Sequence, residues 1–340
     1  MEILKNYSLK NLNTFGFESI AKFYTKVRSV PELKDVLRDS RFISENIFVL
    51  GGGSNVLFTK DFDGLVIHMG VMGVEISSED DEKIVFKVGA GENWDDFVKF
   101  TVEEGYFGLE NLSFIPGSVG ASCIQNIGAY GKEAKEFIKK VLVLNRDTLK
   151  VEELSNADCG MGYRTSAFKT KFKDKYIVTH VFLELSKKQE NFNLDYSGVK
   201  EQLLGKEINA KNIRNAIISI RKEKLPDPKV LGNAGSFFKN VEMEVYKLEE
   251  LKKKFPLLKD VPIYPSPIGV KIPTAWLIDK CGFKGKGKKE GSSVGSYEKQ
   301  ALILVNYGGT GQQMKLFALE IQNTVYEKFG IKIVPEVCIV

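Results

Sequence analysis

Apolar and polar positions alternate over short stretches in the first third of the chain, and two other stretches repeat with helical spacing. Alternation predicts strands, and a period of 3.6 residues predicts helices. Strands are expected at 21–27, 46–50, 56–58, 65–69, 73–77, 84–89, 137–144 and 176–185. Helices are expected at 31–39, opened by Ser29 and Pro31, and at 94–104, ended by Gly105.

The pattern changes after about residue 225. Helices are expected at 240–254, 274–280 and 312–329, and strands at 301–306 and 331–340. This part predicts an α+β unit. The stretch Lys-Leu-Pro-Asp-Pro-Lys at 224–229 is the expected boundary, so the domains are predicted to be 1–225 and 226–340.

Composition narrows the class of protein. The 340 residues are 43% hydrophobic and 27% charged, as in soluble globular proteins. No run approaches the roughly 20 apolar residues of a membrane span, and no secretory signal is visible. A cytoplasmic protein without a membrane partner is expected. The net charge of +5 is mild and the lysines are scattered, which suits an anionic small molecule and gives no indication of nucleic acid.

Cysteine and histidine usage argues against metal sites and disulfides. The four cysteines are far apart and none forms a C-x-x-C pair. The two histidines, His68 and His180, lie in strand-like runs, where a structural role is expected. No metal is therefore predicted.

The first glycine-rich loop, Gly-Gly-Gly-Ser-Asn at 51–55, follows a strand. Consecutive glycines let backbone N–H groups converge on an anion. A dinucleotide fingerprint would need a third glycine and a following helix. Val56 stands at that glycine position and begins a strand-like run, so a standard Rossmann site is disfavoured.

Two further loops are candidates for ligand contact. The stretch 115–131 contains four glycines together with Ser118, Gln125, Asn126 and Tyr130, which suits a wall around an extended cofactor. The stretch 282–289 resembles a P-loop but has Lys289 where Ser or Thr is required. It is predicted to be either a solvated surface loop or a lid over an anionic substrate.

The segment Gly-Asn-Ala-Gly-Ser-Phe-Phe-Lys-Asn at 232–240 offers a hydroxyl at Ser236. A serine that acts as an acid must lie close to the reacting atom and have its alkoxide stabilised. The alternative is a tight turn that enters a strand through Phe237 and Phe238.

Taken together, seven motifs resemble the UDP-N-acetylenolpyruvoylglucosamine reductase family. They lie in order at 51–55, 115–131, 162–166, 224–228, 232–240, 275–279 and 335–337. The resemblance runs from about Asn13 onward. It implies an α+β protein with a two-subdomain FAD-binding domain of the vanillyl-alcohol-oxidase (PCMH) type, with its core at about 17–188, followed by a smaller α+β substrate-binding domain.

The resemblance also implies the chemistry. In the family, NADPH reduces non-covalent FAD, and the enolpyruvyl ether of UDP-N-acetylglucosamine is then reduced to the lactyl ether, giving UDP-N-acetylmuramate for peptidoglycan synthesis. Ser236 would deliver the proton, and Arg164 and Glu336 would stabilise the enolate. Glu336 is expected to have a raised pKa, because only a protonated carboxyl group can donate a hydrogen bond.

The remaining site residues follow from the same resemblance. The residues expected to bind the cofactor are Gly51, Gly52, Gly53, Ser54, Asn55, Pro116, Gly117, Ser118, Gly120, Asn126, Gly128 and Arg221. The residues expected to bind the substrate are Tyr130, Tyr196, Lys224, Asn240, Lys284 and Gln300. Tyr196 would close over the diphosphate, as in one subclass of the family. The substrates are small molecules, and a monomer is expected.

Two rival functions remain open at this point. A flavin oxidase of the same cofactor fold would keep both glycine-rich loops without needing Ser236, Arg164 and Glu336 as a set. Such oxidases can attach flavin covalently, and Cys123 is the position to check. A nucleotide-sugar binding module without catalysis is the second rival.

Overall fold

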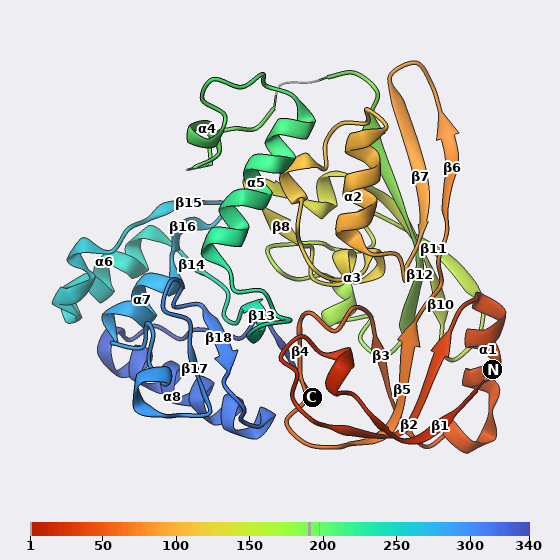
Figure 1. Ribbon diagram of the computed structural model, residues 1–340, viewed down its shortest axis with the longest axis horizontal. Coiled ribbons are helices and arrows are strands. Elements are labelled where there is room, and N and C mark those ends of the chain that lie inside the picture. Colours follow the sequence, from red (N-terminus) through yellow and green to blue (C-terminus); the bar gives the residue numbers. More distant parts are fainter. Residues whose placement is uncertain (1, 190–191, 197) are drawn as a thin grey trace. The chain divides into compact units, whose positions relative to one another are not determined.

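The computed structural model describes residues 2–189, 192–196 and 198–340 (Figure 1). The chain forms two compact units. The first comprises Met1–Tyr7, Ala21–Gly53 and Asp63–Glu223, and the second comprises Ser8–Ile20, Ser54–Phe62 and Lys224–Val340. Two short N-terminal segments therefore belong to the same compact unit as the C-terminal third.

The first unit contains two sheets. The smaller has the order β1-β2-β5-β3 and the larger the order β11-β10-β12-β7-β6. The strands are β1 (Leu4–Ser8), β2 (Ile20–Val27), β3 (Asn46–Leu50), β5 (Phe62–Met69), β6 (Val74–Glu79), β7 (Lys83–Gly89), β10 (Ile138–Asn145), β11 (Val151–Ser155) and β12 (Tyr176–Ser186). The larger sheet is antiparallel throughout, whereas β3 runs parallel to β5.

Helices and a short hairpin complete the first unit. They are α1 (Val30–Arg38), α2 (Trp94–Glu103), α3 (Val119–Ile124), α4 (Val199–Gln202), α5 (Ala210–Lys224), β8 (Gly128–Ala129) and β9 (Lys132–Glu133). Local sequence explains the first two helices. The Ser29 side chain accepts a hydrogen bond from the Glu32 amide, and Asn93 does the same for Asp96. Gly105 follows α2 with a φ of 76°, as expected for a residue that ends a helix.

The second unit has three small sheets, of order β13-β18-β17, β14-β16-β15 and β19-β4. The strands are β4 (Val56–Leu57), β13 (Gly232–Ser236), β14 (Val241–Met243), β15 (Tyr264–Ser266), β16 (Gly269–Ile272), β17 (Val294–Ser296), β18 (Ile303–Asn306) and β19 (Cys338–Ile339). The helices are α6 (Val245–Lys254), α7 (Thr274–Lys280) and α8 (Gly311–Phe329). Its core includes Phe15 and Leu57 together with Phe237 and Phe238.

Three expectations about secondary structure were wrong. The predicted helix at 240–254 begins only at Val245, because Val241–Met243 pairs with β16. The predicted strand at 331–340 is interrupted: Pro335 forms a single bridge with Phe238, and Cys338–Ile339 pairs parallel to β4. The stretch 115–131 is not a loop throughout, because it contains α3 and β8. In each case a long-range pairing or packing contact decides the structure.

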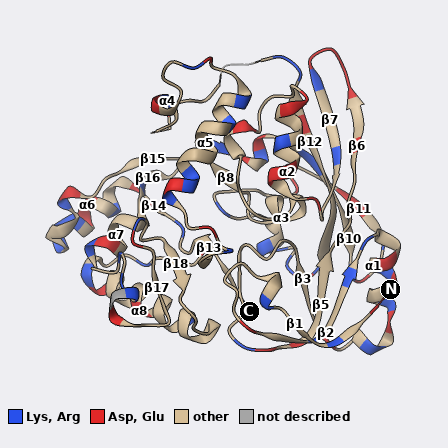
Figure 2. Cartoon of the chain, viewed as in Figure 1, with Lys and Arg blue, Asp and Glu red and all other residues tan. Residues whose placement is uncertain are grey.

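Charges are distributed over both units. Figure 2 shows Lys and Arg interspersed with Asp and Glu along the helices and strands. Within the described part of the chain, no helix is long and apolar enough to cross a membrane. In the same residues, no group of three or more His, Cys, Asp or Glu side chains could hold a metal ion.

Candidate active site

The two glycine-rich loops of the first unit pack backbone against backbone. A Cβ added at Gly52 would lie 2.9 Å from the Cα of Gly117, and one at Gly51 would lie 2.6 Å from the Oγ of Ser118. Gly117 also has a φ of 123°, which other residues rarely adopt. The loops can therefore approach each other because glycine stands at 52 and 117, whereas the close contact at Gly51 involves only the Ser118 side chain.

These loops suit an anionic group of a cofactor. Within the described part of the chain, the amide N–H groups of Gly52, Gly117 and Ser118 have no hydrogen-bond acceptor. Ser118 is buried and directly precedes α3. Backbone N–H groups of glycine-rich loops can bind phosphate oxygens. The residues present therefore fit the pyrophosphate of FAD.

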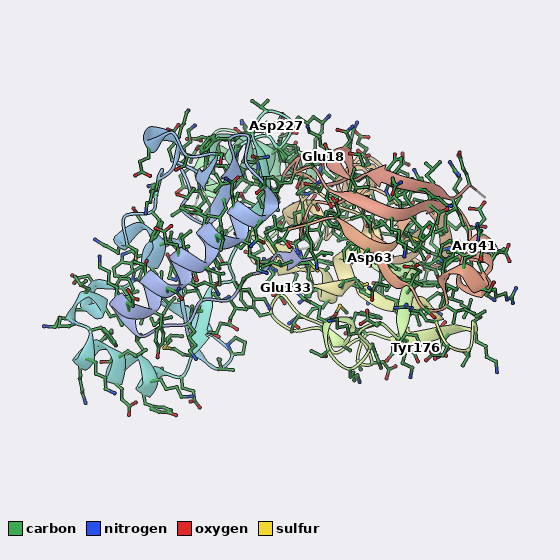
Figure 3. All side chains as sticks on the ribbon, turned by 90° about the horizontal axis from the view of Figure 1, so that it is seen from below. Glu18, Arg41, Asp63, Glu133, Tyr176 and Asp227 are labelled. Carbon is green, nitrogen blue, oxygen red and sulfur yellow. The ribbon has the colours of Figure 1, made fainter. Side chains whose placement is uncertain are left out.

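Arg164 is held against the second glycine-rich loop in a strained conformation. Its φ is 51°, and its guanidinium donates to the backbone carbonyl of Asn126 at 3.1 Å and to that of Gly128. Asn126 is fully buried, and its side chain bonds to Gly162 and Glu133 (labelled in Figure 3). Because that amide is engaged with protein atoms, we expect any cofactor contact of Asn126 to come from its backbone.

Tyr130, Tyr196 and Arg221 form a second cluster in the first unit. The tyrosine rings meet edge to face, with centroids 5.2 Å apart. Burial raises the pKa of Tyr130, and the nearby Arg221 guanidinium opposes that rise. Arg221 Nε also donates to the carbonyl of Phe114 at 3.0 Å. The structure thus brings together one predicted cofactor residue and two predicted substrate residues.

Two residues that the sequence did not single out support this cluster. Asp95 accepts hydrogen bonds from the amide of Phe114 at 2.5 Å and from both terminal nitrogens of Arg214 at 2.6 and 3.0 Å. The Phe114 peptide is therefore fixed from both sides, by Asp95 and by Arg221. Asp95 looks like an ordinary acidic residue in the first turn of a helix, so no local signal marks its role.

In the second unit, Ser236 and Glu336 lie on adjoining segments. The Glu336 amide donates to the carbonyl of Phe237 at 2.7 Å, directly beside Ser236. Asn55 Nδ2 donates to the carbonyl of Glu336 at 3.3 Å. The Ser236 side chain is exposed and that of Glu336 is half-buried. Two predicted catalytic residues and one predicted cofactor residue thus meet within one compact unit.

The other predicted substrate residues are more dispersed. Ser236 pairs with Ile303, and Gln300 precedes that strand and accepts a hydrogen bond from the Leu302 amide at 3.4 Å. Asn240 Oδ1 accepts from the Thr274 amide at 3.1 Å and so caps α7. Lys224 is exposed at the end of α5.

The lysine-rich stretch at 282–289 is built from hydrogen-bonded turns. The hydroxyl of Ser296 donates to the Phe283 carbonyl and accepts from the Gly285 amide at 3.1 Å. The Ser296 amide donates to the carbonyl of Lys286 at 3.0 Å. Lys284 is exposed, and the side chain of Lys289 lies outside the described residues. The stretch is thus tied to β17 at several points.

Cys123 does not suit a covalent flavin link. Its side chain has no exposed surface and packs in the core of the first unit. Burial strongly raises the pKa of the thiol. A reactive cysteine needs the opposite environment, exposed and electropositive.

Comparisons with known proteins define the class to which the chain belongs. Residues 21–152 match the family described as FAD binding domain, which defines the class as a flavoprotein. Residues 227–340 match the family described as UDP-N-acetylenolpyruvoylglucosamine reductase, C-terminal domain. The UDP-N-acetylenolpyruvoylglucosamine reductase of Flavobacterium johnsoniae is 46% identical to this chain, and the match covers 100% of both chains. The enzyme of the same name from Bacteroides fragilis is 43% identical, and that match covers 98% of both chains.

A solved structure extends the likeness to the fold. The crystal structure of UDP-N-acetylenolpyruvylglucosamine reductase from Thermus caldophilus superposes with a TM-score of 0.66 at 22% identity, covering 99% of this chain and 98% of that one. The chain belongs to the UDP-N-acetylenolpyruvoylglucosamine reductase family, and it is an FAD-dependent oxidoreductase. The predicted family and the predicted α+β fold class with an FAD-binding domain are confirmed.

Proposed function

We propose that this protein reduces the enolpyruvyl ether of UDP-N-acetylglucosamine to the lactyl ether, with NADPH as the hydride donor and non-covalent FAD as the carrier. The product, UDP-N-acetylmuramate, would serve peptidoglycan synthesis. The protein would act as a cytoplasmic monomer on small molecules. The observation that carries the proposal is the meeting of Ser236, Glu336 and Asn55 on adjoining segments of the second unit.

The proposed reaction makes two demands on the protein. The bound flavin supplies a hydride to the terminal carbon of the enolpyruvyl group. Negative charge then develops on the neighbouring carbon and spreads onto the substrate carboxylate. The protein must stabilise that charge and deliver a proton to the carbon.

The chain has a residue for each of these roles. The guanidinium of Arg164 is permanently charged and suits the developing carboxylate-enolate. Glu336, if protonated, would donate a hydrogen bond to the same charge. The Ser236 hydroxyl is exposed and free to face a ligand, and it would protonate the carbon. We assign these three residues to catalysis.

The remaining site residues would bind either the cofactor or the substrate. The backbone of the glycine-rich loops (Gly51, Gly52, Gly53, Ser54, Asn55, Pro116, Gly117, Ser118, Gly120, Asn126, Gly128) and Arg221 would hold FAD. Tyr130, Tyr196, Lys224, Asn240, Lys284 and Gln300 would hold the nucleotide sugar. Lys224 and Lys284 are exposed ammonium groups, which suit a diphosphate.

One anaerobic titration tests cofactor, donor and acceptor together. The purified protein should show the visible absorption of oxidised flavin, lose it on addition of NADPH, and regain it with the enolpyruvyl substrate. Recovery with oxygen alone would favour an oxidase. A protein that stays colourless after incubation with FAD would overturn the proposal.

A further inference from the structure

Asn111 is a buried residue in the short helix η3 (Glu110–Leu112), and its side chain joins two distant segments. Its Nδ2 donates to the backbone carbonyl of Tyr130 at 2.8 Å and to that of Asn193 at 2.9 Å. Only the nitrogen end of the amide can donate, so these two carbonyls fix the orientation of the side chain.

The other end of the same side chain is unsatisfied. Among the described residues, Asn111 Oδ1 is the buried side-chain atom with no hydrogen-bond partner. A buried acceptor without a partner destabilises a fold, and an apolar side chain of similar size would avoid that cost. The value of an asparagine here therefore lies in the two bonds that its nitrogen donates.

Hydrogen bonds from buried side chains hold the short helix that carries Asn111. The indole of Trp94 donates to the Leu112 carbonyl at 2.9 Å, and the Ser113 hydroxyl donates to the Glu110 carbonyl at 2.6 Å. All of these side chains are buried. Asn111 can consequently hold other segments without moving itself.

The segments that Asn111 holds carry the two tyrosines of the first unit. Tyr130 has a φ of 48°, a conformation that a non-glycine residue adopts only when its surroundings enforce it. Asn193 makes a second link, from its Nδ2 to the Gly131 carbonyl at 3.4 Å. Three residues further along, the ring of Tyr196 meets that of Tyr130.

We propose that Asn111 is a positioning residue that ties the backbone at Tyr130 to the backbone at Asn193 and so aligns the rings of Tyr130 and Tyr196 for the diphosphate of the nucleotide sugar. This inference rests on the proposed function, which assigns both tyrosines to the substrate. In this proposal Asn111 acts through the two tyrosines and not by its own contact with a ligand.

A double-mutant cycle tests whether Asn111 acts through Tyr196. Asn111→Ala and Tyr196→Ala should each raise the KM for the enolpyruvyl substrate by about 10-fold, within the loss that a small misplacement causes. The double variant should raise KM by clearly less than the product of the two single effects, because the alignment of Tyr196 can be lost only once. The rate of flavin reduction by NADPH should not change. KM increases that multiply in the double variant would overturn the inference.

Two further variants separate the donated bonds from general stability. Asn111→Asp keeps the shape but loses the donor, so it should raise KM as much as Asn111→Ala. Asn145→Ala removes another buried asparagine of the first unit, one that bonds to Glu152 at 2.8 Å. It should lower Tm and leave KM unchanged. A wild-type KM in Asn111→Asp would overturn the inference.

Amide hydrogen exchange gives a readout that does not depend on activity. In Asn111→Ala, peptides covering 126–131 and 192–196 should exchange faster, whereas the β10–β11 hairpin should not change. Unchanged exchange would overturn the positioning role. Faster exchange with a wild-type KM in both Asn111→Ala and Tyr196→Ala would instead overturn the substrate role of the tyrosines, and with it the alignment that we infer.

Discussion

The candidate residues of the two units are positioned by different means. In the first unit three of them, Asn126, Tyr130 and Arg164, have positive φ. In the second unit Ser236 ends a strand, and Glu336 follows a segment that pairs with Phe238. Every non-glycine residue with positive φ in the described chain belongs to the first unit.

This difference shows how each kind of site is stabilised. A residue in a strained backbone conformation costs about 1–3 kcal/mol, and the surrounding structure must offset that cost. In the first unit, buried networks around Asp95 and Asn126 do so. In the second unit, strand pairing fixes the backbone of Ser236, and a hydrogen bond to Phe237 fixes that of Glu336. Under the proposed function, backbone groups of the glycine-rich loops would bind the cofactor, whereas Ser236 and Glu336 would act through their side chains.

The sharpest way to break this comparison is Ser236→Ala. If the second unit supplies the proton, reoxidation of reduced flavin by the enolpyruvyl substrate should slow by roughly 10²- to 10⁴-fold, the usual contribution of a general acid. Reduction by NADPH should stay within a few-fold of wild type. Stopped-flow absorbance under anaerobic conditions measures both half-reactions.

The control is Ser266→Ala, which removes a serine hydroxyl of the second unit that bonds to Glu242 at 2.9 Å. It should leave both half-reactions unchanged. Equal slowing of the two half-reactions in Ser236→Ala would point to a defect in folding or binding and would contradict the proton-donor role.

The backbone side of the comparison is tested by Gly52→Ala. The added Cβ would lie 2.9 Å from the Cα of Gly117, so the two loops must separate. Overpacking of this kind costs about 1–3 kcal/mol, which predicts a 5- to 150-fold weaker Kd for FAD. Quenching of flavin fluorescence on reconstitution of the apoprotein measures that Kd.

Gly105→Ala is the matched control for Gly52→Ala. Gly105 has a φ of 76° and nothing within 4 Å of an added Cβ, so alanine would be strained without any clash. We expect a lower Tm and an unchanged Kd for FAD. A weakened Kd in both variants would mean that general destabilisation accounts for the loss.

Asp95→Asn tests whether the buried network supports the strained loop. The variant weakens the contact with Arg214, whose side chain is 10% exposed. We expect about 2 kcal/mol of lost stability, less than the 3–5 kcal/mol for a fully buried pair because Asp95 is 23% exposed. Urea unfolding measures it, and an unchanged midpoint would show that the network does not offset the strain.

The smallest effect on stability is expected at Glu184, in strand β12 of the larger sheet of the first unit. Hydrogen bonds from Lys83 and Lys139 lower the pKa of Glu184. Its stabilising contribution is therefore full above the ordinary pKa of a glutamate and is lost as the pH falls through the lowered value. Glu184→Gln should cost at most about 1 kcal/mol at pH 7, because the pair is partly exposed. That difference should shrink as the pH falls through the lowered pKa, as unfolding over a series of acid pH values can show.

Local signals predicted much of the fold. The ranges 46–50 and 274–280 match β3 and α7 at both ends, and the cap at Ser29 is where the sequence places it. The helix α5 was missed, and so was the strand β14. The pairing of β14 with β16 depends on residues about 30 positions away, which no short window contains.

Some features of the candidate site could likewise be predicted from local sequence, and others could not. The glycine-rich loops could be recognised from the sequence, because clustered glycines usually mark a tight turn or a close approach of the backbone to a ligand. By contrast, Asp95 and Arg214 are 119 residues apart, and neither lies in a motif. The adjacency of Ser236 and Glu336 likewise arises from long-range strand pairing. The raised pKa of Glu336 stays a prediction.

The parallel pairing of Val56 with Cys338 affects the protein while it is being synthesised. Asn55 donates a hydrogen bond to the carbonyl of Glu336, which lies 281 positions later in the chain. At typical rates of synthesis, roughly 15 to 55 s therefore pass between the synthesis of the two residues. During that time the apolar segment Val56–Leu57 has no strand beside it. An exposed strand edge invites association with other chains, so this segment is open to such association during this interval.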